Sequence, residues 1–271
     1  MSVAYLRSWR AVGSAAARIR SIPSLRPRFR AMASSAFQKV QIHRGNGDDF
    51  TFDAYIVGEE GAPGVVVLQE WWGVDYEVKN HAQTIASKGF RSLIPDLYRG
   101  KLGLDAAEAQ HLMESLDWPG AVKDVAASVK WLKEHGSKKV GVTGFCMGGA
   151  LSLAAGVLVP DVSAVVAFYG TPSPDLADTS KLKIPVQAHF GELDQLAGFS
   201  DVAAAKALEK NLEAAGVDSE VIIYPNNGHA FMNSSDEAVK RNKECGFADH
   251  DNEAVEKAWA RFEAWFSKYL K

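Results

Sequence analysis

Short apolar runs recur along the chain and are separated by stretches in which apolar residues return every three or four positions. These runs predict strands at 50–57, 64–69, 90–94, 140–143, 164–169, 184–190 and 221–224. Residues 50–57 alternate apolar and polar in their first half, which predicts an edge strand. Residues 65–68 read Val-Val-Val-Leu, which predicts a strand buried on both faces.

The helical pattern is clearest in two segments. Val122, Val125, Val129 and Leu132 fall on one face of a predicted helix. The last helix carries an apolar stripe that predicts core packing rather than a ligand site: Val255, Trp259, Phe262, Trp265, Phe266 and Tyr269. Strands alternating with helices predict an α/β fold, a single domain over 37–271 with a mostly parallel central sheet flanked by helices.

Residues 1–34 differ from the rest of the chain. They contain seven arginines, several serines and alanines, and no acidic residue. This composition is typical of an organelle transit peptide. A basic arm for nucleic acid is the alternative reading of the charge block. Alanine-rich spacing favours targeting, with a mitochondrion preferred over a chloroplast. Met32 offers an internal start that would give a cytosolic form.

Without that segment, the rest of the chain has a strongly negative net charge. The whole chain has 30 basic and 33 acidic residues, and subtracting the seven arginines leaves 23 against 33, a net charge of −10. An acidic body argues against nucleic acid and anionic membrane surfaces as partners. Cys146 and Cys245 are too few and too far apart for a disulfide framework. Because the histidines other than His229 lack metal-ligand spacing, we expect no metal. We expect a monomer.

The sextet Gly144-Phe145-Cys146-Met147-Gly148-Gly149 carries the chemistry. It follows a predicted strand and precedes a small-residue helix pattern. Strand, sharp turn and helix with the reactive residue at the turn is the geometry of a nucleophile elbow, and the flanking glycines relieve clashes there. A lone cysteine is more often a core residue than a nucleophile, so the assignment depends on finding its partners. A helix beginning at Cys146 would favour the thiolate.

The partners follow in the order that the fold requires, which is nucleophile, acid, histidine. Asp194 comes directly after the strand predicted at 184–190, with Glu192 as the competing acid. His229 follows the strand predicted at 221–224. Asp194 could instead cap the helix that begins near Phe199. Together and in this order they predict a Cys146–His229–Asp194 triad, in which Asp194 orients His229 and His229 transfers the proton.

Residues Gln69-Glu70-Trp71-Trp72-Gly73 close another predicted strand, at the point where this fold supplies an oxyanion-hole amide. We assign that amide to Trp71 and the other to Met147. Glu70 is unusual there, because a carboxylate beside such a site must be paired or partly neutralised. A loop salt bridge is its alternative role.

Four motifs carry a resemblance to a known family: Gln69-Glu70 before Gly73, residues 95–98, Gly144–Gly149 with Cys146, and residues 228–231. The chain resembles the dienelactone hydrolase (carboxymethylenebutenolidase) family of α/β-hydrolases over 37–270. The resemblance implies a cofactor-independent hydrolase with the triad Cys146, His229 and Asp194. It also implies that Glu70 pairs with the thiol at rest and helps to activate it on substrate binding. Such a guarded thiol is less open to oxidation.

The chain departs from the family where bacterial members hold a substrate carboxylate with two arginines. One of these positions is Asn233, and the other region reads Arg99-Gly100-Lys101, with the charge displaced. We expect an aromatic pocket, with Trp72, Tyr98, Arg99, Phe145 and Phe231 binding the substrate. The leading function is a thiol esterase for small lactones, enol-lactones or activated esters that forms an acyl-enzyme. The alternatives are a sensor for a butenolide-like signal and, without a nearby resolving cysteine, a redox thiol.

Overall fold

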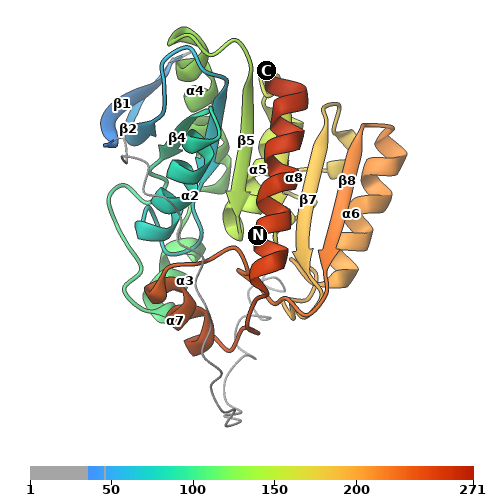
Figure 1. The fold of residues 1–271 in the computed structure, drawn as a ribbon. Coiled ribbons are helices and arrows are strands. Elements are labelled where there is room, and N and C mark those ends of the chain that lie inside the picture. The colour runs from blue at the N-terminus through green and yellow to red at the C-terminus, as the bar shows by residue number, and fades with distance from the viewer. Residues whose placement is uncertain (1–35, 46) are drawn as a thin grey trace.

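The computed structural model describes residues 36–45 and 47–271, so the predicted transit peptide at 1–34 and Met32 lie outside the described residues. Within this range it confirms the α/β fold with a mostly parallel sheet (Figure 1). The strands are β1 (Gln38–Gly45), β2 (Asp48–Val57), β3 (Gly64–Leu68), β4 (Arg91–Pro95), β5 (Val140–Phe145), β6 (Ala164–Phe168), β7 (Val186–Gly191) and β8 (Ser219–Tyr224).

The sheet has the order β1-β2-β4-β3-β5-β6-β7-β8. The six strands from β4 to β8 in this order run parallel, while β1 and β2 are antiparallel additions. The prediction that 50–57 forms the edge strand is wrong, because β1 pairs on its outer side. Only Ile42 of β1 is buried, so the strand has no apolar run that the pattern could reveal.

Helices cover both faces of the sheet. Contacts place α2 and α8 on one face, and α4, α5 and α6 on the other, while α3 and α7 lie beyond the carboxyl ends of the strands (Figure 1). The helices are α2 (Tyr76–Ser87), α3 (Ala106–Glu114), α4 (Trp118–Glu134), α5 (Met147–Leu158), α6 (Val202–Ala215), α7 (Asp236–Glu244) and α8 (Asn252–Leu270), with a 3₁₀ turn at Thr179–Lys181.

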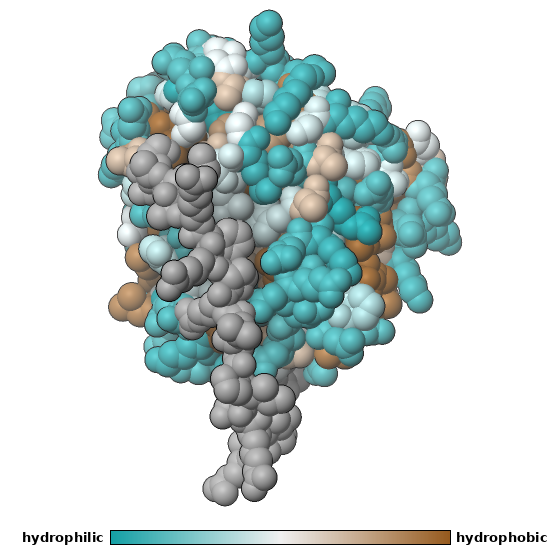
Figure 2. All heavy atoms as spheres, viewed as in Figure 1, coloured by the Kyte–Doolittle hydropathy of each residue, from teal (hydrophilic) through white to brown (hydrophobic). Residues whose placement is uncertain are grey.

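The helical stripes pack as their spacing predicts. Val125, Val129 and Leu132 of α4 are fully buried, and so are Phe262 and Phe266 of α8. The visible side of the α2–α8 face is largely hydrophilic, with apolar residues confined to small areas (Figure 2). The apolar side of these helices therefore faces the sheet. The carboxyl ends of the parallel strands are not covered by these helices, and this is where open α/β sheets bind their ligands.

Candidate active site

Cys146 occupies a strained turn between β5 and α5. Its backbone has φ 57° and ψ −119°, a region that non-glycine residues rarely adopt. The turn closes only because its neighbours lack side chains. A Cβ at Gly144 would lie 2.1 Å from the Gly148 carbonyl oxygen, and a Cβ at Gly149 would lie 2.3 Å from that of Phe168. The glycine pattern in the sequence is therefore a requirement of packing at this elbow.

His229 lies between Asp194 and Cys146. Its Nδ1 is 2.7 Å from Asp194 Oδ2, and both side chains are buried. Because the carboxylate accepts a hydrogen bond from Nδ1–H, Nε2 is the nitrogen left for the thiol side. Burial lowers the pKa of His229, but Asp194 and the Cys146 sulfur outweigh burial and hold that pKa well above its usual range. The arrangement can take a proton from a thiol.

Burial disfavours the charged form of the Cys146 thiol. Burial raises its pKa; interactions with His229 and the Met147 backbone N–H act in the opposite direction, and the Glu70 carboxylate adds to the rise. The helix terminus thus favours the thiolate as the sequence suggests, but burial is the larger influence.

The loops that carry the acid and the histidine pack against each other. A Cβ at Gly191, at the end of β7, would lie 2.4 Å from the Asn227 carbonyl oxygen, so only glycine allows this approach. Of the two candidate acids, Asp194 contacts His229, whereas the exposed Glu192 accepts a hydrogen bond from the Asn226 amide. Asp194 does not cap the following helix, because Asp201 is the N-cap of α6.

Ser200 is a second neighbour of the histidine that the sequence did not reveal. Its Oγ lies 3.1 Å from His229 Nδ1, and the residue is completely buried. A serine in a loop just before a helix usually indicates a cap, so nothing in the pattern distinguishes this one.

Glu70 sits in the same site without a cation as hydrogen-bond partner. Asn233 Nδ2 donates to its Oε2 at 3.1 Å, and the Tyr169 hydroxyl donates to its Oε1 at 3.3 Å. Burial raises the pKa of Glu70 to about 7, although Asn233 and His229 lower it in part. The alternative of a loop salt bridge is wrong. Tyr169 is not among the predicted site residues, although its position at the carboxyl end of a predicted strand indicates one.

The two predicted oxyanion-hole residues lie on adjoining segments. Met147 is the first residue of α5, where backbone N–H groups have no partner within the helix. A Cβ at Gly148 would lie 2.5 Å from the Leu68 carbonyl oxygen, so the start of α5 lies against the end of β3. Trp71 follows that strand end by three residues and is buried.

Of the predicted substrate-binding residues, Tyr98 and Trp72 keep polar or cationic neighbours, whereas Phe145 and Phe231 lie in the core. The Tyr98 hydroxyl donates to Met147 Sδ at 3.2 Å, and burial, together with the nearby Cys146, raises the pKa of that hydroxyl. Trp72 lies under the Arg241 guanidinium, 4.7 Å from the ring centroid. The prediction is wrong for Phe145 and Phe231, because both are completely buried in the core. Phe145 stacks between His81 and Phe168, and Phe231 packs against Tyr169.

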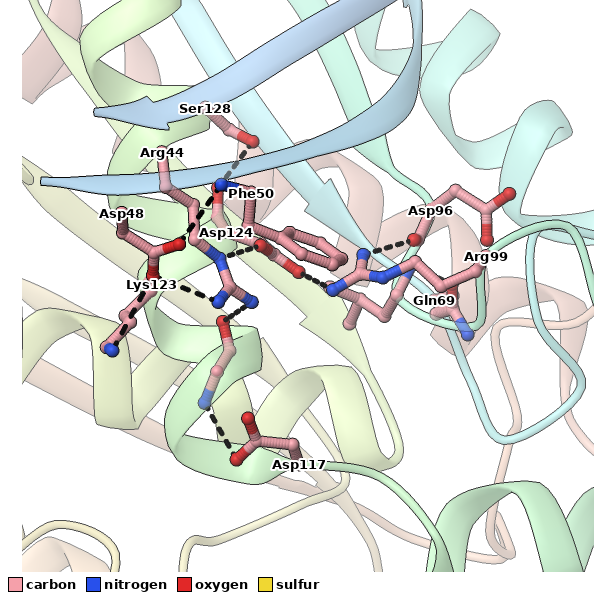
Figure 3. A network of polar contacts seen from close by, with 12 residues as sticks. Arg44, Asp48, Phe50, Gln69, Asp96, Arg99, Asp117, Lys123, Asp124 and Ser128 are labelled. Carbon is pink, nitrogen blue, oxygen red and sulfur yellow. Dashed lines mark hydrogen bonds and ion pairs between the residues drawn. The ribbon is translucent and has the colours of Figure 1, made fainter.

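The prediction for Arg99 is also wrong. Its guanidinium forms an ion pair with the buried Asp124 and donates to the Asp96 carbonyl oxygen, in a separate network that includes Arg44 (Figure 3). Phe50 lies against both guanidinium groups. Arg99 therefore holds the hairpin of β1 and β2, and the loop after β4, against α4.

A cavity of about 190 Å³ opens beside His229. Its walls come from the loop after β7 and the segment after α7, and they carry no formally charged side chain other than the histidine when protonated: Leu193, Gln195, Leu196, Gly246, Phe247 and Ala248. The Phe247 ring meets the imidazole edge to face, with centroids 5.0 Å apart. The space next to the imidazole is thus suited to an uncharged group.

Cys245 lies nearer to the site than its place in the sequence suggests. It is the C-cap of α7 and directly precedes three residues of the cavity beside His229, and its pKa is raised to about 11 by burial and by Glu244, Glu70 and Cys146. Both cysteines are free thiols. Within the described part of the chain, no group of His, Cys, Asp and Glu side chains could hold a metal ion, and no helix there is long and apolar enough to span a bilayer.

The parallel sheet, the elbow after β5 and the paired loops after β7 and β8 define an α/β-hydrolase. Comparison with known proteins gives the family: the profile of the dienelactone hydrolase family matches residues 52–270, and the chain belongs to that family. This chain is therefore an enzyme of the dienelactone hydrolase family, a lactone or ester hydrolase.

Individual relatives agree with this placement. "Protein usf" of Aquifex pyrophilus is 35% identical over 78% of this chain and 90% of its own length. A "Putative carboxymethylenebutenolidase" of Aquifex aeolicus is 31% identical over 77% and 89%. The crystal structure of the dienelactone hydrolase-like promiscuous phosphotriesterase P91 from metagenomic libraries superposes with a TM-score of 0.74 over 87% of this chain and 99% of its own, at 24% identity. That likeness shows the fold.

Proposed function

We propose that this protein hydrolyses small lactones, enol-lactones or activated esters through a Cys146–His229–Asp194 triad. The observation that carries the proposal is the buried thiol on a strained elbow beside an imidazole that is itself held 2.7 Å from a carboxylate. This is the nucleophile, base and orienting group that covalent acyl transfer requires.

The reaction proceeds in two halves. His229 Nε2 takes the thiol proton, the sulfur attacks the acyl carbon, and the developing oxyanion is stabilised by the Trp71 and Met147 amides. The carbon–oxygen bond to the leaving group breaks, and that oxygen receives the proton from Nε2. Water, deprotonated by His229, then attacks the thioester, which releases the acid and restores the Cys146 thiol. No metal or cofactor enters either half.

Glu70 guards the thiol before substrate arrives. A carboxyl group with a pKa of about 7, held by Asn233 and Tyr169 rather than by an arginine, changes protonation state near neutral pH. We infer that it pairs with the Cys146 thiol at rest and helps His229 to remove the proton when substrate binds. The acid thereby keeps the nucleophile out of its reactive, oxidisable form until it is needed.

The substrate is uncharged at the reacting end. The cavity beside His229 is lined by apolar side chains and Gln195, and Arg99 is already paired with Asp124. We infer that Tyr98 and Trp72 also contact the substrate, because the Tyr98 hydroxyl bonds to Met147 next to Cys146 and Trp72 follows Trp71. A substrate carboxylate next to Glu70 would meet like charge instead of a guanidinium clamp.

Incubation with a panel of lactones and aryl esters, followed by mass spectrometry, tests the proposal. We expect acyl adducts on Cys146 and sustained turnover, with a loss of about 10⁴-fold or more in kcat/KM in Cys146→Ala. Cys245→Ala is the matched control and should retain wild-type rates. A single labelling event without turnover would indicate instead a sensor of butenolide-like ligands. If no compound forms an adduct on Cys146 and none is hydrolysed faster than by Cys146→Ala, the triad is contradicted.

A further inference from the structure

The loop between β7 and α6 places the buried hydroxyl of Ser200 beside His229, at the ring nitrogen that faces away from Cys146. Ser200 Oγ is 3.1 Å from His229 Nδ1, while Asp194 Oδ2 is 2.7 Å from the same nitrogen. Ser200 has no exposed surface, so water does not compete for its hydroxyl. One ring nitrogen therefore has two oxygen neighbours within hydrogen-bond distance.

The protonation state of the ring decides what the hydroxyl does. An ionised carboxylate is an acceptor only, so its short contact requires a proton on Nδ1. A nitrogen that already carries a proton and belongs to an aromatic ring has no lone pair to offer Ser200. The hydroxyl oxygen must then accept, and it forms the second branch of a bifurcated hydrogen bond.

The backbone fixes both acceptors as one unit. The Leu196 amide donates to Asp194 Oδ1 at 3.0 Å, and the Ser200 amide donates to the Leu196 carbonyl oxygen at 3.0 Å. The Phe199 carbonyl oxygen accepts from both the amide and the hydroxyl of Thr171, at 2.9 and 2.8 Å. The backbone of Ser200 is thus held from both sides.

We propose that Ser200 is a positioning residue of this enzyme, which acts through His229. Its oxygen fixes the ring orientation in which Nε2 faces the Cys146 thiol, and it shares the positive charge when Nε2 accepts the thiol proton. The Nδ1 proton stays in place throughout the cycle, while the thiol proton moves to Nε2 and then to the leaving oxygen. The inference rests on the proposed function, because it assumes that His229 serves Cys146.

The rate of Cys146 alkylation by iodoacetamide as a function of pH tests this role without any substrate. In Ser200→Ala, the imidazolium loses an acceptor, so thiolate formation should need a pH higher by roughly half a unit to one unit. With an ester substrate, kcat should fall about tenfold with KM little changed. Ser200→Thr keeps the hydroxyl and should restore most of both values.

Two further variants separate the possible causes. Thr171→Val removes a buried hydroxyl but keeps the Thr171 amide bond to the Phe199 carbonyl oxygen and the Ser200 amide bond to Leu196, so it should lower the melting temperature without moving the alkylation midpoint. His229→Ala should abolish the wild-type pH profile; if it leaves the profile unchanged, the triad itself fails. If His229→Ala acts as expected but Ser200→Ala matches wild type, or Ser200→Thr is as impaired as Ser200→Ala, the role of Ser200 is overturned.

Discussion

Two buried carboxylates in this protein have opposite surroundings. Asp124 is completely buried on α4 and lies between two guanidinium groups, with Arg44 Nε at 2.7 Å from Oδ1 and Arg99 bound to Oδ2 (Figure 3). Glu70, at the end of β3, is also buried, but its hydrogen-bond partners are an amide and a phenol.

The difference separates a structural acid from a reactive one. At Asp124, the charge is compensated and three parts of the fold are joined, because Asp124 lies on α4, Arg44 on β1 and Arg99 in the loop after β4. At Glu70, the neutral partners leave burial uncompensated, and the pKa rises to about 7. Burial alone does not make a carboxylate functional; burial with partners that leave its charge uncompensated makes it able to exchange a proton near neutral pH.

Removal of the Asp124 charge should have the largest effect on stability. Asp124→Asn leaves two guanidinium groups without their carboxylate, one of them mostly buried, so the free energy of unfolding should fall by about 3 kcal/mol or more. Urea denaturation measures this. The variant should keep kcat/KM within about twofold once folded. A large loss of activity in the fully folded variant would show that the network reaches the site.

Removal of the Glu70 charge should act in the opposite direction. Between about pH 4.5 and 7 the unfolded chain has released the proton that the folded protein keeps, so the wild-type free energy of unfolding falls as pH rises. Glu70→Gln avoids this loss and should be more stable than wild type above pH 7, by up to about 3 kcal/mol. Its kcat/KM should nevertheless drop, by about tenfold to a hundredfold. Urea titrations across this pH range, with initial rates, test both.

Glu77 provides the matched control for this pH dependence. It is also buried, but it accepts hydrogen bonds from the Ser234 and Ser235 amides at 2.7 and 3.1 Å. Burial raises its pKa, yet His81 and these hydrogen bonds outweigh burial and lower it overall. Glu77→Gln should therefore lose stability above about pH 4.5, the reverse of Glu70→Gln. The same sign for both variants would contradict the distinction between the two acids.

The sequence identifies those parts of the site that the backbone dictates. The elbow is visible because glycine is the only residue that fits at Gly144 and Gly149, and Asp194 and His229 are visible because they follow strand ends. The order of these motifs was enough for the family, and the alternating pattern was enough for the fold.

What the sequence does not show is which of several suitable side chains turns toward the site. Arg99 directly follows the motif at 95–98 and Phe145 lies within the motif Gly144–Gly149, but Arg99 turns to Asp124 and Phe145 into the core. Ser200 and Tyr169 join the site through packing between distant loops. Edge strand β1 was missed for a related reason, since solvent rather than a core contacts most of its side chains.

Arg99 gives the smallest effect and the sharpest test of its assignment. Arg99→Met keeps the aliphatic packing against Phe50 and leaves Asp124 paired with Arg44, so the free energy of unfolding should fall by about 1 kcal/mol. Because the guanidinium is committed to Asp124, kcat/KM should stay within about twofold for esters with and without a carboxylate. Lys101→Met, which removes the neighbouring exposed cation, is the companion variant. If Arg99→Met selectively impaired hydrolysis of carboxylate-bearing esters while Lys101→Met did not, Arg99 would have to leave Asp124 during catalysis, and the separation between the two acids would no longer hold.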